Sequence, residues 1–143
     1  MLNVLLPVDG SEQSERSVDR FIKTLEWYKG GVDLHLLNVQ HQIPGGERMA
    51  SLIGHEQLRG YHHDEGMQAL QGARAKLDAA GIKYQYHISV GEPAELIVQY
   101  AREKRSDQIV MGARGAGAVE KLLLGSVVTR VIGLSEVPVL VVK

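Results

Sequence analysis

The sequence of 143 residues contains no cysteine, four prolines, few aromatic residues and no long apolar run. Without cysteine there is no disulfide, no thiolate metal ligand and no cysteine nucleophile. Nothing approaches the roughly 20 apolar residues of a membrane-spanning helix. The apolar run near the N-terminus is short and follows no basic stretch, so it does not resemble a signal peptide. We therefore expect a cytoplasmic protein with no membrane insertion.

An excess of charge of either sign is missing too. Sixteen lysines and arginines face 17 acidic residues, and the formal net charge is -1. This balance predicts no broad basic face for nucleic-acid binding. Hydrophobic residues make up 44% of the chain, which is ordinary for globular proteins. We expect one domain spanning residues 1–143, since a chain of this length can bury a core without covalent staples.

Short apolar runs alternate along the chain with segments in which apolar residues recur at helical spacing. The expected helices follow Ser11, run from Gly66 to Leu77, begin at Pro93, and extend from Ser126 to Leu134. The expected strands are 2–8, 32–39, 82–89, 107–111 and 137–142. Such alternation predicts an α/β fold of three layers, with a mostly parallel five-stranded sheet between helices.

The segment 40–65 gives a weaker pattern. It opens with the loop residues Pro44, Gly45 and Gly46, and we expect it to be partly helical and mobile. Glycines at 54, 60, 66 and 72 recur at a spacing that does not return to one helix face, and the sequence offers no reason for it. Each would weaken a helix by about 1 kcal/mol relative to alanine.

The stretch GARGAGAVEKLLLGSV, residues 112–127, resembles a phosphate-binding loop but fits neither common glycine-rich pattern. In the P-loop pattern the glycine at 117 would need Lys and then Ser or Thr, yet Ala118 and Val119 follow. In the dinucleotide pattern Glu120 occupies the place of the last glycine, and the stretch follows the fourth expected strand instead of the first.

The helix expected to open at Gly125 and Ser126 gives a different route to phosphate binding. Unpaired N–H groups and a partial positive charge at a helix N-terminus attract anions. Arg114 and Lys121 add positive charge nearby. If the first and fourth strands are neighbours, Asp9 faces this loop and could accept hydrogen bonds from ribose hydroxyls. A plain turn followed by a helix cap remains the alternative explanation.

The spacing Gly112-x2-Gly115-x9-Gly125-Ser126 resembles the nucleotide-binding signature G-x2-G-x9-G-(S/T) of the universal stress protein family. The resemblance extends over the whole chain, through LNVLLPVDGSEQSERSV, LLNV, VGEPAELIVQYA and VPVLVVK. It implies a Rossmann-like strand order 3-2-1-4-5 and an adenine nucleotide at the seam between strands one and four. Ala113 stands where the family often has serine, and Ala116 where it often has a basic residue.

The resemblance also implies a role for individual residues. Pro7, Val8 and Asp9 would line the adenosine part of the site, and Val39 would meet adenine through its backbone. Gly112 would lie near the ribose, and the phosphates would be held by Gly115, Gly125, Ser126 and Val127. Met111 and Arg114 complete the expected site. The implied cofactor is ATP, or ADP or AMP, with or without Mg²⁺.

Strand order 3-2-1-4-5 leaves the last expected strand, 137–142, as an apolar edge that needs a cover. Family resemblance and two-fold symmetry predict a homodimer through this strand. The implied function is an ATP-binding stress-response sensor or regulator. The alternatives are a slow ATP hydrolase using the same site and a structural dimer that binds no nucleotide. The sequence offers no dedicated base or carboxylate cluster at the loop, so we predict no catalytic residues.

Several other residues attract attention. His55, His62 and His63 lie among acidic residues, but neighbouring histidines point apart, so we expect a solvated surface cluster and no metal site. We expect His35, in the middle of a strand, to be a packed or an edge histidine and not a base. Trp27 and Tyr28, at the end of the first helix, are expected to pack as well.

Overall fold

The computed structural model describes residues 1–115 and 123–143 and contains a five-stranded parallel sheet. Its strands are β1 (Leu2–Pro7), β2 (Val32–Gln40), β3 (Tyr84–Val90), β4 (Gln108–Gly112) and β5 (Val139–Val142). They lie in the order β3-β2-β1-β4-β5, and every neighbouring pair is parallel. The predicted fold class and strand order are confirmed.

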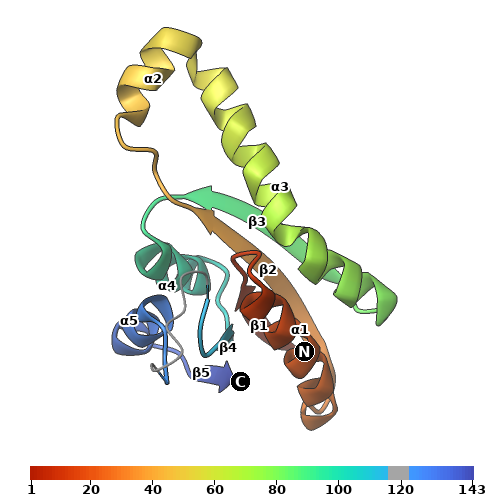
Figure 1. The fold of residues 1–143 in the computed structure, drawn as a ribbon. Helices are drawn as coiled ribbons and strands as arrows, with labels where there is room; N and C mark the ends of the chain where they lie inside the picture. The colour runs from red at the N-terminus through yellow and green to blue at the C-terminus, as the bar shows by residue number, and fades with distance from the viewer. Residues whose placement is uncertain (116–122) are drawn as a thin grey trace.

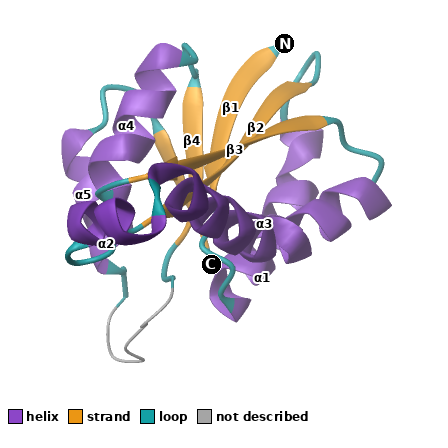
Figure 2. Cartoon of the chain, turned by 90° about the horizontal axis from the view of Figure 1, so that it is seen from above, coloured by secondary structure: helices purple, strands orange, loops and turns teal. Residues whose placement is uncertain are grey.

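Helices cover both faces of the sheet (Figures 1 and 2). Helices α1 (Glu12–Thr24) and α3 (His55–Ala79) pack on one face, where their residues share a core with β1 and β2. Helices α4 (Pro93–Glu103) and α5 (Ser126–Leu134) pack on the other. Alternation along a strand divides the side chains between the faces, so Val4 and Leu6 belong to the first core and Leu5 to the second.

The first helix begins and ends close to its predicted limits. Ser11 is its N-cap, and the hydroxyl oxygen accepts a hydrogen bond from the Ser14 N–H at 3.1 Å. A short 3₁₀ helix, Leu25–Trp27, follows it. Tyr28 packs on the core and donates to Gln108 Oε1 at 2.7 Å, as expected of a packed residue. The same expectation is wrong for Trp27, which is 71% exposed because the 3₁₀ turn faces it toward solvent.

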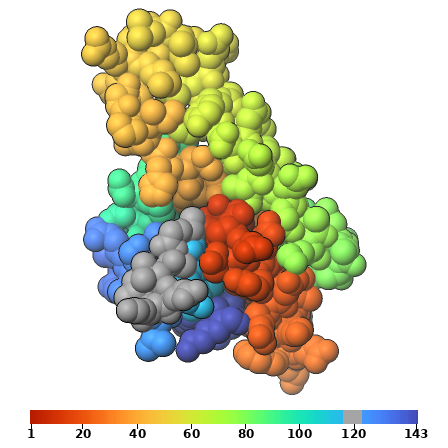
Figure 3. All heavy atoms as spheres, in the orientation of Figure 1, coloured from red at the N-terminus to blue at the C-terminus, as the bar shows by residue number. Residues whose placement is uncertain are grey.

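Helix α3 begins at His55, well before the predicted start at Gly66. A shorter helix, α2 (Gly46–Ile53), precedes it, and Gly54 with φ 94° separates the two. Figures 1 and 3 show α2 and the adjoining end of α3 extending beyond the sheet. The glycines that weakened the sequence-based prediction did not prevent the helix, because packing of its C-terminal part outweighs their low propensity.

Two of the regularly spaced glycines are explained by close packing of α3. A Cβ built on Gly66 would lie 2.6 Å from Ile88 Cγ2 on β3, and one on Gly72 would collide with the Glu15 carboxylate of α1. A larger side chain at Gly66 would require Ile88 to shift, and one at Gly72 would displace the Glu15 side chain. Gly60 meets no described atom within 4 Å, so its place in the series has no packing reason there.

The histidines divide between surface and interior. His55 and His63 are exposed, as predicted, but His62 is buried on the inner side of α3, so the predicted solvated cluster is wrong at that position. The helix turns adjacent residues by about 100°, which separates His62 from His63. His35 is buried as expected, and its Nδ1 lies 2.9 Å from His87 Nε2 on the neighbouring strand.

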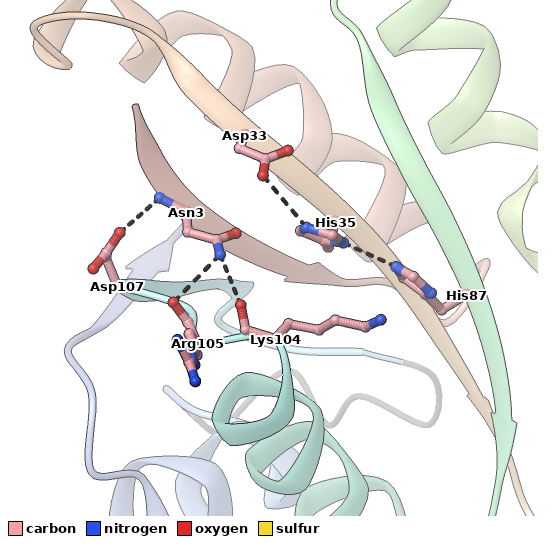
Figure 4. A network of polar contacts seen from close by, with 7 residues as sticks. All are labelled: Asn3, Asp33, His35, His87, Lys104, Arg105 and Asp107. Carbon is pink, nitrogen blue, oxygen red and sulfur yellow. Dashed lines mark hydrogen bonds and ion pairs between the residues drawn. The ribbon is translucent and has the colours of Figure 1, made fainter.

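The amino end of the sheet is fastened by Asn3 (Figure 4). The Asn3 N–H donates to Asp107 Oδ2 at 2.8 Å, and Asn3 Nδ2 donates to the Lys104 carbonyl at 2.7 Å. The second bond satisfies a carbonyl group at the C-terminus of α4, and the two together tie β1 to the turn before β4. Because the amino end is occupied by these bonds, loops can form a site at the carboxyl end of the sheet.

Candidate functional site

A cavity of about 520 Å³ opens at the carboxyl ends of β1, β2 and β4. The N-terminal turns of α4 and α5 complete its wall through Pro93 and Ser126. Volumes of this size are typical of small-molecule sites. The cavity therefore occupies the position at which open parallel sheets bind ligands.

Strand order explains why the cavity lies there. From β1 the chain proceeds to β2 and β3 on one side, and then returns to place β4 and β5 on the other. The change of direction falls between β1 and β4, where Val4 pairs with Gln108 and Leu5 with Ile109. Loops leaving these two strands diverge to opposite faces, which leaves a crevice between them.

The cavity lining includes every site residue predicted from the sequence. These are Pro7, Val8, Asp9, Val39, Met111, Gly112, Arg114, Gly115, Gly125, Ser126 and Val127. Residues separated by more than 100 positions are thus brought to one wall by the sheet. Lys121, the second predicted cation, lies outside the described residues.

Other lining residues were not predicted. They are Ser14, Leu37, Asn38, Gln40, His41, Pro93, Ile97 and Val128. A signal existed for Asn38 and Gln40, because both are polar residues at the end of an otherwise apolar strand. Ser14 carried no such signal, since it reads as an ordinary residue of the first helix turn.

Asp9 is held at the mouth of β1 by contacts on both sides. Its N–H donates to Ser14 Oγ at 3.1 Å, and its Oδ1 accepts from the Ser11 N–H at 2.9 Å. A Cβ built on Gly115 would collide with Asp9 Oδ2. The predicted approach of the Asp9 carboxylate to the glycine loop is thus present in the structure.

The N-terminus of α5 forms another part of the cavity wall. Gly125 is the N-cap, and no side chain caps the helix there. The Gly125 N–H donates to the Ala113 carbonyl at 2.7 Å, which ties the two ends of the loop together. The first-turn N–H groups after Gly125 have no intrahelical acceptors, so this end of α5 presents donors and partial positive charge.

Charged groups differ between the cavity and its rim. Among the described lining residues, Asp9 is the one carboxylate and Arg114 the one guanidinium. At the rim Arg130 of α5 donates through Nε to Glu95 Oε1 of α4 at 2.7 Å. This hydrogen bond lowers the pKa of the Glu95 carboxyl and raises that of Arg130. It joins the two helices whose first turns border the cavity.

The cavity lining is partly polar and partly apolar. The lining combines the N-terminal donors of α5 and the Asp9 carboxylate with apolar residues such as Val39 and Ile97. Within residues 1–115 and 123–143, no group of three or more histidine or acidic side chains could hold a metal ion. In the same ranges no helix is long and apolar enough to cross a membrane.

Comparison with known proteins gives one consistent family. The family model for the universal stress protein family matches residues 1–143. Universal stress protein MJ0531 of Methanocaldococcus jannaschii is 33% identical over 142 residues, covering 98% of this chain and 81% of that protein.

Solved structures agree with the sequence comparison. The structure of MJ0577, reported as a structure-based assignment of biochemical function, has a TM-score of 0.78 and 30% identity, covering 99% of this chain and 95% of that one. A universal stress protein solved in complex with cAMP has a TM-score of 0.66 and 26% identity, covering 99% of this chain and 96% of its own.

Proposed function

The chain belongs to the universal stress protein family, and we propose that its cavity binds an adenine nucleotide, with ATP as the principal ligand. The observation that carries this proposal is the convergence of all the predicted site residues on one cavity at the β1–β4 seam. A relative of the same fold has been solved in complex with cAMP, which supports adenine nucleotides as the class of ligand.

The two ends of the cavity suit the two ends of a nucleotide. Donors at the start of α5, with Gly115, Gly125 and Ser126, would hold the phosphates. Asp9 would accept hydrogen bonds from the ribose, and the backbone of Val39 would meet the base. A nucleotide supplies its own anionic phosphates, and Mg²⁺ could accompany them with Asp9 as the nearest described carboxylate of the lining.

The output of binding would be a signal and not a chemical reaction. Phosphoryl transfer needs positioned metal ions and a group that orients the attacking water, and the described lining offers Asp9 as its one carboxylate. We therefore propose a stress-response sensor or regulator of the cytoplasm. A slow ATP hydrolase at the same site and a dimer that binds no nucleotide are the alternatives to test.

We further propose that residues 1–143 form one nucleotide-binding domain that pairs into a homodimer. Strand β5 is an edge of the sheet. Exposed strand edges recruit other strands unless they are covered, and a second copy related by a two-fold axis would cover both edges at once.

The direct test uses protein purified without added nucleotide. Mass spectrometry of small molecules released on denaturation should detect ATP, ADP or AMP, and calorimetric titration of the stripped protein should show saturable ATP binding. Protein that releases no adenine nucleotide and shows no heat or thermal stabilisation with ATP would leave the non-binding dimer as the better description.

A further inference from the structure

Two side-chain amides at the end of β2 border the cavity and are joined by hydrogen bonds. Asn38 Nδ2 donates to the Val8 carbonyl at 2.9 Å. Gln40 Nε2 donates to Asn38 Oδ1 at 2.6 Å. Asn38 is only 1% exposed, so its amide has no freedom to turn toward solvent.

The Val8 carbonyl fixes the orientation of both amides. A main-chain carbonyl can only accept, so the Asn38 NH₂ group must face it. The Asn38 oxygen then faces Gln40, and Gln40 must donate a hydrogen bond to it through its own NH₂ group. Turning either amide over would set two donors or two acceptors against each other. Gln40 Oε1 is consequently the amide oxygen of this pair that is left to accept a hydrogen bond from a ligand.

The position of Gln40 places this acceptor at the base end of the proposed ligand. Gln40 follows Val39, whose backbone is expected to meet the base, and both residues line the cavity. The backbone of Gln40 is itself fixed, because its carbonyl accepts from the Gly91 N–H at 2.9 Å. The side chain therefore extends from a rigid point on the cavity wall.

We propose that Gln40, oriented by Asn38, selects purines with a 6-amino group over purines with a 6-oxo group. This inference rests on the proposed nucleotide function. The amide oxygen of Gln40 accepts a hydrogen bond from an exocyclic amine, whereas a 6-oxo group would set oxygen against oxygen. A site built around one hydrogen bond rejects an analogue that leaves its polar group unpaired. Asn38 is the positioning residue and Gln40 the specificity-determining one.

ATP and ITP are the appropriate probes, because ITP replaces the 6-amino group by oxygen and keeps the ribose and triphosphate. Dissociation constants of both nucleotides are measured by calorimetry on the stripped full-length chain. In Gln40→Met, which keeps the side-chain length without the acceptor, the ITP-to-ATP ratio of dissociation constants should fall roughly tenfold. Gln99→Met is the matched control, since Gln99 is an exposed residue of α4 that donates to Glu103 and does not line the cavity; its ratio should equal that of the wild type.

A second variant reverses the chemistry at the same point. The Gln40→Lys ammonium group can still donate to Asn38 Oδ1 but offers the ligand a donor in place of an acceptor. Its ITP-to-ATP ratio of dissociation constants should fall below that of Gln40→Met, because the new donor favours ITP. Circular dichroism verifies that both variants are folded, and either one alone suffices for the test.

The outcomes separate this inference from the function on which it rests. If the wild type binds ATP and ITP equally, or if either folded variant keeps the wild-type ratio, the assignment of Gln40 is overturned and nucleotide binding stands. If the wild type binds neither nucleotide, the proposed function is overturned and the assignment of Gln40 with it.

Discussion

Asp9 Oδ2 and Gly115 are so close that a Cβ on the glycine would collide with the carboxylate. The contact joins the end of β1 to the loop after β4 across the cavity mouth. It explains why position 115 of the loop pattern holds glycine. A side chain there would take the space of the Asp9 carboxylate, whose position is fixed by a 2.9 Å hydrogen bond from the Ser11 N–H. The same space must admit the proposed ligand.

Gly115→Ala should therefore weaken ATP binding by more than about tenfold, 1.4 kcal/mol, because the methyl group displaces Asp9 from its place. Calorimetric titration measures the loss. Gly60→Ala is the control, since no described atom lies within 4 Å of a Cβ there. That variant should bind ATP like the wild type. An unchanged affinity for ATP in Gly115→Ala would contradict the assignment of Asp9 to the binding site.

Gly125→Val tests the proposed phosphate end. A Cβ on Gly125 would lie 3.4 Å from Arg114 Cα, which is an ordinary contact, so its described neighbours do not require glycine at this position. A branched side chain should nevertheless block a phosphate from the N-terminal donors of α5 and abolish the rise in melting temperature produced by ATP. Gly133→Val, later in the same helix, should keep that rise. A full rise in Gly125→Val would contradict the assignment of α5.

Asp9 also decides between binding and hydrolysis. We expect no phosphate release above a protein-free blank at saturating ATP, because the described lining provides no second carboxylate. Asp9→Asn keeps an oxygen for the Ser11 N–H and should weaken binding only. A coupled phosphate assay measures the release. Phosphate release by the wild type that declines in Asp9→Asn would favour the hydrolase alternative.

The sequence was most informative where one physical signal dominated. Continuous apolar strands such as 2–8 and 32–39 are buried on both faces, and this pattern belongs to parallel sheets. The location of the candidate site could be predicted as well, because sheet order alone brings Asp9 and Gly112 to one end of neighbouring strands. Whether the residues gathered there bind a nucleotide remains a prediction.

The sequence was less informative where distant contacts decide. Gly66 and Gly72 read as helix-weakening residues, yet they let α3 approach Ile88 and Glu15. Trp27 read as a packing residue, but its exposure depends on a single 3₁₀ turn. Asn38 and Gln40 were not predicted as lining residues, because the sequence does not show that Asn38 bonds the carbonyl of Val8, just after β1, and that Gln40 bonds Asn38.

The proposed dimer can be tested through the backbone of β5. The carbonyls of Pro138 and Val142 accept from Ile109 and Ala113 at 2.9 and 3.0 Å. Because backbone groups alternate in direction along a strand, the N–H of Val141 points to the open edge. Val141→Pro should leave pairing with β4 intact and convert the dimer to a monomer in light scattering. Val141→Ala keeps the N–H and should remain dimeric; a dimeric Val141→Pro would place the interface elsewhere.

The pair of buried His35 and half-buried His87 makes stability depend on pH. Burial lowers the pKa of His87 below its ordinary value of 6.5, and the neighbouring His35 and Lys104 lower it further. His35 Nδ1 faces His87 Nε2 at 2.9 Å, with the Tyr100 ring packed against His87 and Asp33 on the far side of His35. The folded state therefore favours neutral His87 more strongly than the unfolded chain does.

A lowered pKa in the folded state means that the unfolded chain takes up the proton first. The contribution of His87 to stability is therefore complete above pH 6.5 and declines as the pH falls below that value toward the lower pKa of the folded state. Calorimetric melting temperatures at pH 7.5 and pH 5 should show this decline in the wild type and a smaller one in His87→Phe. His63→Gln, at an exposed position of α3, is the control and should retain the full decline. Equal pH dependence in His87→Phe and the wild type would show that the pair does not couple proton uptake to unfolding.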